Sequence, residues 1–249
     1  MGGSHLITAE AFNQVQRFLL EKKHLLVIVS ALGDTTANLQ ALLTLAEKGQ
    51  PYQAHLDKIL TFHQSLSTTL LGSAEPFERY SADDISFLEH SLTQIQKEQQ
   101  CSSQLKDHIL SMGEYWSTFL FSNHSTTDFV LLDAANILVV NKKNNVCEIN
   151  WPLTQTLFKA FIDNNPAENY IITGYVARNL QGDKITLGFE GSDLSAALFG
   201  QLFAVDNMHF LSNVDGLYTA DPHKVAQAQI ISELSYEEAR ELVYFGGSF

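Results

Sequence analysis

The sequence predicts an α/β fold in which residues 1–249 form a single compact domain with a helical insertion. Three observations lead to this prediction. Short, β-branched, apolar segments alternate with polar loops and helical patterns, as in sheets whose two faces are both covered. Residues 52–122 have helical periodicity almost throughout. No repeat, low-complexity tract or linker rich in Pro, Gly or Ser divides the chain.

The first α/β unit lies near the N-terminus. Residues 8–22 predict a helix, because Thr8 is a suitable N-cap and apolar residues recur behind it at helical spacing. Residues 24–30 are continuously apolar and β-branched, which is typical of a buried parallel strand. A polar turn at 31–34 then leads into a predicted helix over 36–47.

The long helical stretch has loop signals near residues 72–76. Several histidines lie on its apolar faces. We expect them to be hydrogen-bonded core or boundary residues, because neither an HExxH motif nor a cluster of His and Cys accompanies them. The sequence therefore predicts no metal site built from protein ligands.

Strand patterns return after the helices. Residues 129–133, 137–140 and 170–175 predict strands, and a hairpin is expected around 181–183. The remaining expectations are a turn at 188–191, a helix from about Ser192 with Leu194, Leu198, Leu202 and Val205 on one face, a strand at 208–211, a loop at 212–222, and a last helix with a Ser235 and Glu238 capping box.

Composition excludes several classes of protein. The formal net charge is −13, with 15 Lys and Arg against 28 Asp and Glu, which argues against nucleic-acid binding. Cys101 and Cys147 lack CxxC spacing and are expected to be reduced, small buried apolar residues. No apolar run is long enough to span a membrane, and the N-terminus lacks a signal-peptide pattern. We therefore expect a cytoplasmic protein.

Three polar, glycine-containing loops follow apolar strands, at residues 30–36, 188–193 and 212–216. Ligands of open α/β sheets bind at this edge, where backbone N–H groups favour phosphate or carboxylate. The same residue types also make ordinary turns, so each loop alone is a weak signal. The absence of GxxxxGK[ST] and GxGxxG motifs disfavours P-loop and dinucleotide-binding folds.

Taken in order, these segments resemble the aspartokinases of the amino-acid kinase superfamily. The resemblance rests on residues 172–175 (Ile-Thr-Gly-Tyr), 191–197 (Gly-Ser-Asp-Leu-Ser-Ala-Ala), 213–222 (Asn-Val-Asp-Gly-Leu-Tyr-Thr-Ala-Asp-Pro) and 234–239 (Leu-Ser-Tyr-Glu-Glu-Ala), and extends to 111–114 (Ser-Met-Gly-Glu), 29–31 (Val-Ser-Ala) and 2–4 (Gly-Gly-Ser). It implies a three-layer sandwich with a mainly parallel central sheet. The layout looks most like the kinase portion of enzymes fused to homoserine dehydrogenase.

The resemblance also implies an activity, namely transfer of the γ-phosphoryl group of MgATP to the side-chain carboxylate of L-aspartate, on the route to lysine, threonine and methionine. Asp193 and Gly3 would belong to the catalytic centre, and Gly2, Gly3 and Ser4 would touch the phosphates. The other implied roles are amino-acid binding by Ser30, Thr36 and Glu114, and nucleotide binding by Ser212, Asn213, Tyr218 and Asp221. Considered without the resemblance, Glu114 would be interpreted as an exposed helical carboxylate.

The sequence departs from the family pattern wherever a cation is expected. No lysine precedes Gly2, and Phe189, Tyr115, His223 and Ser248 stand at positions where the family has arginine or lysine. Lys184 and Lys224 are either substitutes or solvated surface residues. Because phosphoryl transfer needs positive charge around the transferred group, two interpretations stay open. The chain is either a weakened aspartokinase or a silent pseudokinase that supports a fused dehydrogenase.

Two further expectations concern the ends and the assembly of the chain. Residues 1–5 either match the opening of the family or form an unrelated leader, and the chain ends at Phe249 inside a family segment, which indicates a fragment of a longer polypeptide. Members of the family often dimerise, so a homodimer is a possible partner arrangement.

Overall fold

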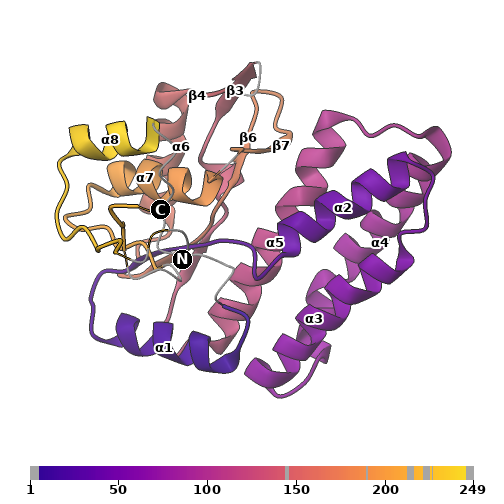
Figure 1. The fold of residues 1–249 in the computed structure, drawn as a ribbon, viewed down its shortest axis with the longest axis horizontal. Helices are drawn as coiled ribbons and strands as arrows, with labels where there is room; N and C mark the ends of the chain where they lie inside the picture. Colours follow the sequence, from indigo (N-terminus) through magenta and orange to yellow (C-terminus); the bar gives the residue numbers. More distant parts are fainter. Residues whose placement is uncertain are drawn as a thin grey trace. The chain divides into compact units, whose positions relative to one another are not determined.

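The computed structural model describes residues 6–143, 146–188, 190–211, 216–220, 225 and 227–244. The chain divides into two compact units, Met1–Phe210 and Leu211–Phe249. The larger unit contains a parallel sheet in the order β1-β5-β2, with helices packed around it (Figure 1). These three strands are β1 (Leu26–Val29), β5 (Tyr170–Thr173) and β2 (Val130–Leu132).

The two faces of this sheet are buried in different hydrophobic clusters. Val27 and Val29 of β1 pack with residues of the helical region, whereas Ile28 between them packs with apolar residues of α6 (Trp151–Asn164) and α7 (Gly191–Phe203). Side chains alternate between faces along a strand, so helices cover both sides of the sheet. The predicted three-layer α/β fold with a mainly parallel sheet is confirmed.

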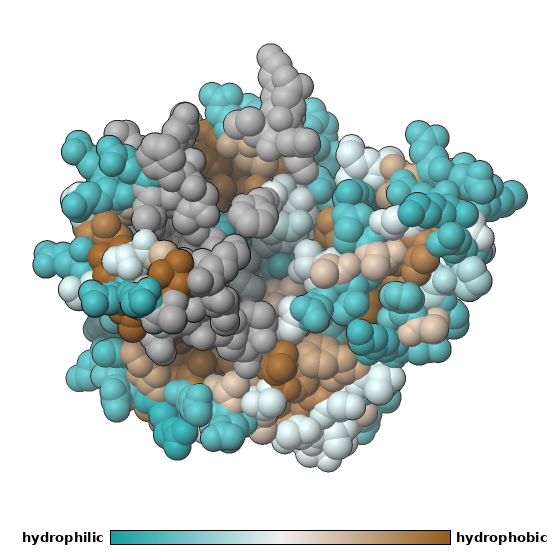
Figure 2. All heavy atoms as spheres, in the orientation of Figure 1, coloured by the Kyte–Doolittle hydropathy of each residue, from teal (hydrophilic) through white to brown (hydrophobic). Residues whose placement is uncertain are grey.

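The helical insertion has the extent that the sequence predicts. Its helices are α2 (Thr35–Glu47), α3 (Gln53–Leu71), α4 (Glu75–Glu98) and α5 (Ser103–His124). Gly72 ends α3 in the left-handed conformation, which glycine adopts without strain. On the face shown in Figure 2, hydrophilic side chains cover most of this insertion and hydrophobic ones are scattered between them.

His63 on α3 is a core residue, as expected for histidines on these faces. It is fully buried, its ring stacks on Phe77, and its Nδ1 lies 2.9 Å from the carbonyl oxygen of Ile59. Burial lowers the pKa of His63 to about 4, so the ring is neutral at physiological pH.

The remaining elements of the larger unit flank the sheet. A first helix, α1 (Ala9–Leu20), is capped by Thr8, whose hydroxyl accepts the N–H of Ala11 at 3.3 Å. A short 3-10 helix, η1 (Ala134–Asn136), follows β2. Two antiparallel hairpins complete the unit, β3 (Val140–Lys143) with β4 (Val146–Ile149) and β6 (Val176–Arg178) with β7 (Lys184–Thr186).

Three expectations are corrected here. Residues 208–211 form no strand, because they have no pairing partner among the described residues. Val205 lies beyond α7, which ends when Ala204 adopts φ +50°. The strand predicted at 137–140 begins only at Val140, since residues 134–136 form η1 immediately before it.

The smaller unit contains a β-bridge between Tyr218 and Ile230 and the helix α8 (Tyr236–Tyr244). The predicted capping box is confirmed: the Ser235 N–H donates to Glu238 Oε2 at 2.8 Å, and the Glu238 N–H donates to Ser235 Oγ at 3.2 Å. Among the helices that the structure describes, none combines the length and apolar character needed to cross a membrane.

Candidate active site

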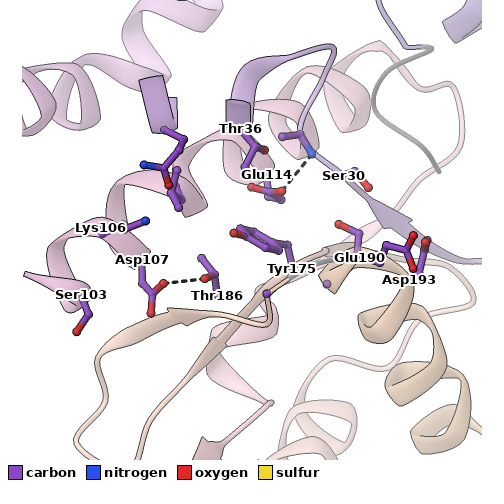
Figure 3. Close-up of a pocket in the computed structure, with 16 residues that line it drawn as sticks. Ser30, Thr36, Ser103, Lys106, Asp107, Glu114, Tyr175, Thr186, Glu190 and Asp193 are labelled. Atoms are coloured by element: carbon purple, nitrogen blue, oxygen red, sulfur yellow. Dashed lines mark hydrogen bonds between the residues drawn. The ribbon is translucent and has the colours of Figure 1, made fainter. Parts of the chain in front are cut away.

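A cavity of about 720 Å³ opens in the larger unit at the carboxyl end of β1. Its walls come from the loop after β1, from α2 and α5, from the turn after β5, from β7, and from the N-terminus of α7 (Figure 3). This is the edge at which the loops were expected to form a ligand site. Segments that are far apart in the sequence therefore meet around one space.

Four of the predicted site residues line this cavity: Ser30, Thr36, Glu114 and Asp193. Tyr218 lies in the smaller unit, where it pairs with Ile230, and its role stays a prediction. The other predicted site residues fall outside the described residues: Gly2, Gly3, Ser4, Ser212, Asn213 and Asp221.

Glu114 is the most unusual group in the cavity. Its side chain is only 3% exposed, so the alternative of an exposed helical carboxylate is wrong. Oε1 accepts a long hydrogen bond of 3.4 Å from the Ala31 N–H, and Oε2 is buried with no hydrogen-bond partner within the described part of the chain. Burial raises the pKa of Glu114 to about 8. A buried oxygen of this kind is normally hydrogen-bonded, and either a water molecule or a donor from a ligand in the cavity can be its partner.

Gly113 explains why Glu114 can approach the loop after β1. A Cβ at Gly113 would lie 2.8 Å from the Cβ of Ala31 and 3.1 Å from Cγ2 of Thr35. Only a residue without a side chain lets α5 pack this closely against the loop. The Gly-Glu pair is thus one structural unit, in which the glycine permits the contact that buries the carboxylate.

The opposite wall is held by a hydrogen bond between α5 and β7. Thr186 Oγ1 donates to Asp107 Oδ1 at 2.7 Å, and both side chains are buried. Asp107 and Glu114 are seven residues apart and therefore lie on the same face of α5, two turns from each other. Tyr175, with φ +67°, also lines the cavity, and burial raises the pKa of its hydroxyl.

The turn into α7 is closely packed. A Cβ at Gly191 would lie 2.6 Å from Cδ2 of Tyr175. The Ser195 hydroxyl donates to the Gly191 carbonyl and accepts the Tyr175 N–H, both at 2.9 Å. These contacts fix the first turn of α7, whose backbone N–H groups and positive dipole end favour an anion.

Among the described residues that line the cavity, acidic residues outnumber basic ones. The carboxyl groups are those of Asp107, Glu114, Glu190 and Asp193, and the single Lys or Arg in this set is Lys106. Of the two lysines that the sequence suggested as substitutes, Lys184 does not line the cavity and its Nζ lies 4.0 Å from the centre of the Tyr115 ring. The other, Lys224, falls outside the described residues.

Tyr115, which stands at a position where the family has arginine, serves as a hydrogen-bond donor. Its hydroxyl donates to Asp133 Oδ1 at 2.8 Å, and the same oxygen accepts the Ala135 N–H at 2.9 Å. The residue thereby links α5 to η1. It supplies no positive charge.

Sequence reasoning missed several lining residues, among them Lys106, Asp107, Tyr175 and Thr186. One signal was available for Asp107, because it precedes Glu114 by seven residues on a predicted helix and so had to share its face. The partnership of Asp107 with Thr186 joins residues far apart in the chain, and no local pattern announces it.

The parallel three-layer fold and this cavity define the class of protein. The chain belongs to the amino acid kinase family, which it matches over residues 1–248. Within that family it is similar to aspartokinases and to the kinase portion of bifunctional enzymes. Bifunctional aspartokinase/homoserine dehydrogenase 1 from Zea mays is 31% identical to this chain and the match covers 99% of it. Bifunctional aspartokinase/homoserine dehydrogenase 2 from Escherichia coli is 27% identical and the match covers 97% of this chain.

Solved structures agree with this assignment. Escherichia coli aspartokinase III, in complex with lysine and aspartate, has a TM-score of 0.77 and 25% identity, and the match covers 99% of this chain and 56% of that one. The chain spans only 28% of the maize relative and 30% of the Escherichia coli bifunctional relative.

Proposed function

We propose that this chain binds L-aspartate and MgATP in the cavity and transfers the γ-phosphoryl group to the side-chain carboxylate of L-aspartate. The observation that carries the proposal is the buried Oε2 of Glu114, which has no hydrogen-bond partner among the residues that the structure describes. Without a ligand the Glu114 carboxyl group keeps its proton at neutral pH, and the ammonium group of an amino acid offers the hydrogen-bond donors and the positive charge that favour its ionised form. The curated relatives are named as aspartokinases, and one structural relative is bound to aspartate and ADP.

The chain's own groups have separable roles in this reaction. Ser30 and Thr36 hydroxyls, which line the cavity beside Glu114, donate to carboxylate oxygens of the amino acid. A side-chain carboxylate oxygen forms a bond to the γ-phosphorus while the bond from that phosphorus to the bridging oxygen of ADP breaks. The products are an acyl phosphate and ADP, and the N–H groups of the first turn of α7 face the anionic phosphate.

The donor set also fits the cation that accompanies ATP. Mg²⁺ prefers oxygen ligands and usually combines one or two carboxylates with substrate phosphates. Asp193 and Glu190, both exposed at the cavity edge, are the residues that would hold it, and it would neutralise charge on the phosphates. Nucleotide contacts from Gly2, Gly3, Ser4, Ser212, Asn213, Tyr218 and Asp221 are part of the same proposal.

The charge of the cavity points to a weakened enzyme. Among the described lining residues, four carboxyl groups face one lysine, whereas the transition state carries excess negative charge on the phosphoryl oxygens. Loss of one well-placed cation costs roughly 10³ to 10⁵ in rate, as arginine fingers show. We therefore expect turnover well below that of a kinase with the full set of family cations.

The second candidate is a catalytically silent domain. The acidic lining favours it, because the same cavity holds an amino acid without needing to stabilise transferred phosphate. In this case the chain acts as a scaffold or ligand-binding partner of a fused dehydrogenase, and the bifunctional relatives carry such a fusion by name.

An acyl-phosphate assay separates the two candidates. The chain is incubated with MgATP, L-aspartate and hydroxylamine, and the hydroxamate is measured beside a positive-control aspartokinase. Hydroxamate that disappears in Asp193→Ala, but persists in the matched surface variant Asp163→Ala, supports the enzyme. A full-length chain that makes no hydroxamate, yet is thermally stabilised by L-aspartate, identifies the silent domain. A ligand present at about 100 times its dissociation constant adds roughly 2.7 kcal/mol.

We also propose a cellular location and the classes of partner for this chain. The cytoplasm is consistent with two cysteines that form no disulfide, although several plant relatives are named as chloroplastic. The net charge of −13 disfavours nucleic acid as a partner, and membrane binding is likewise not expected. A homodimer is the remaining proposal, and its test is the mass of the chain in solution.

A further inference from the structure

Lys106 lies at one end of the cavity, away from the N-terminus of α7. In Figure 3 its ammonium group points into the space between α2 and Tyr175, while Glu190 and Asp193 lie at the other end and Glu114 lies between them. Ser103 and Gln40 line the cavity as well. The cavity therefore has a polar end that the phosphate chemistry at α7 does not use.

Helix geometry explains why Lys106 and Glu114 share this space. They are eight residues apart on α5, which places their Cα atoms about 12 Å apart along the helix axis and close to the same face. Within the part of the chain that the structure describes, Lys106 forms no ion pair. Its neighbour Asp107 is engaged by the Thr186 hydroxyl on β7. The ammonium group is therefore available to a ligand.

Along the cavity, Lys106 lies at an end that can bind a carboxylate, Glu114 lies at a centre that can bind an ammonium group, and the N-terminus of α7 lies at an end that can bind phosphate. An α-amino dicarboxylate has the same order, with its α-carboxylate, α-ammonium and side-chain carboxylate following one another. We propose that Lys106 binds the α-carboxylate of the amino-acid ligand and makes the cavity selective for ligands that carry this group. The proposal rests on the proposed function, because Glu114 must hold the ammonium group of the same molecule.

This assignment distinguishes Lys106 from the lysine that the sequence suggested. Lys184 is held over the Tyr115 ring and does not line the cavity. Lys106, by contrast, is half-buried, lies on the same helix as Glu114 and points into the space. A lysine on α5 thus supplies positive charge to the cavity of a chain whose sequence has Phe189 at a position where the family has arginine.

The test compares ligands as well as variants. Calorimetry measures binding of L-aspartate and of β-alanine, which is aspartate without its α-carboxylate, to the wild-type 249-residue chain and to Lys106→Gln. Lys97→Gln, an exposed lysine on α4, controls for the loss of one positive charge. We expect Lys106→Gln to weaken L-aspartate binding about ten- to a hundred-fold and β-alanine binding less than about two-fold, and Lys97→Gln to change neither.

Three other outcomes of these binding measurements would overturn the inference. Equal weakening of both ligands means that Lys106 is structural, and unchanged L-aspartate binding means that it does not touch the ligand. A wild-type chain that binds no L-aspartate overturns the proposed function together with this inference. A chain that binds L-aspartate but makes no hydroxamate leaves the binding comparison fully readable, so the two failures are distinguishable.

Discussion

Glu114 couples the stability of the protein to pH through a single buried carboxyl group. Its pKa is raised to about 8 in the folded chain, whereas an unfolded glutamate titrates near 4.5. Between these values the folded state keeps a proton that the unfolded state has lost. Stability therefore falls as pH rises through this window, by at most about 1.4 kcal/mol per pH unit, and the loss is complete above about pH 8.

We predict that Glu114→Gln removes this slope, because glutamine has no proton to lose. Urea unfolding of both proteins at several pH values between 5 and 8 measures the effect, and the difference between their free energies of unfolding isolates Glu114 from the other titrating groups. Two curves that run parallel across this range would contradict the buried, unpaired state of the carboxyl group. Glu98→Gln, at an exposed position at the end of α4, serves as the control.

A second residue-scale prediction concerns two helical glycines. At Gly113 an added methyl group would meet Ala31 and Thr35 at 2.8 and 3.1 Å, whereas at Gly200 it would meet the flexible end of Met208. We expect Gly113→Ala to lower the free energy of unfolding by about 1 to 3 kcal/mol and Gly200→Ala to leave it nearly unchanged or raise it. Thermal unfolding measures both, and equal effects would mean that the contact at Gly113 is not tight.

At the scale of elements, α5 organises the site by presenting Lys106, Asp107 and Glu114 to one cavity. The Thr186 to Asp107 hydrogen bond ties this helix to β7, which leads into the loop before α7. We predict that Thr186→Val and Asp107→Asn are coupled by about 1 to 3 kcal/mol in a double-mutant cycle of unfolding free energies. Thr186→Ser keeps the hydroxyl and should retain most of the stability. Additive effects would show that the two side chains act independently.

Elements with local signals were predictable, and elements defined by pairing were not. The Thr8 cap of α1 and the Ser235 capping box of α8 were correct because the signals lie within one turn of each helix. Helix α6 was not predicted, although Asn150 and Pro152 mark its start. The strand predicted at 208–211 was wrong because a short apolar run becomes a strand only where a partner is available.

The residues of the candidate site divide in a similar way, into those that a sequence motif marks and those that only tertiary packing places. Ser30, Thr36, Glu114 and Asp193 were located through motif resemblance, and the structure brings them to one cavity. The burial of Glu114 was not predictable, because it depends on how closely Gly113 packs against a loop from the other end of the chain. Lys106 belongs to no sequence motif, and its place in the cavity follows only from the direction in which α5 runs.

At the scale of the whole molecule, charge governs nucleotide binding. The chain carries a net charge of −13, and four carboxyl groups against one lysine line its cavity among the described residues, so ATP without its metal is repelled. We predict that affinity for Mg²⁺-free ATP rises when monovalent salt increases from about 50 to about 300 mM, because screening reduces the repulsion. Calorimetry or fluorescence titration tests this. An affinity that falls with salt would show that cations dominate the site.

The order of strands in the sheet has a consequence for folding of the chain during its synthesis on the ribosome. β5 lies between β1 and β2, so neither of these strands has a partner in the sheet until Thr173 has been made. At typical rates of translation the 144 residues from Val29 to Thr173 take roughly 7 to 29 s, during which β1 is unpaired beside a helical segment that can already fold, and β2 is unpaired for the last part of this time. The nascent chain is therefore at its most vulnerable to aggregation before the centre of its own sheet exists.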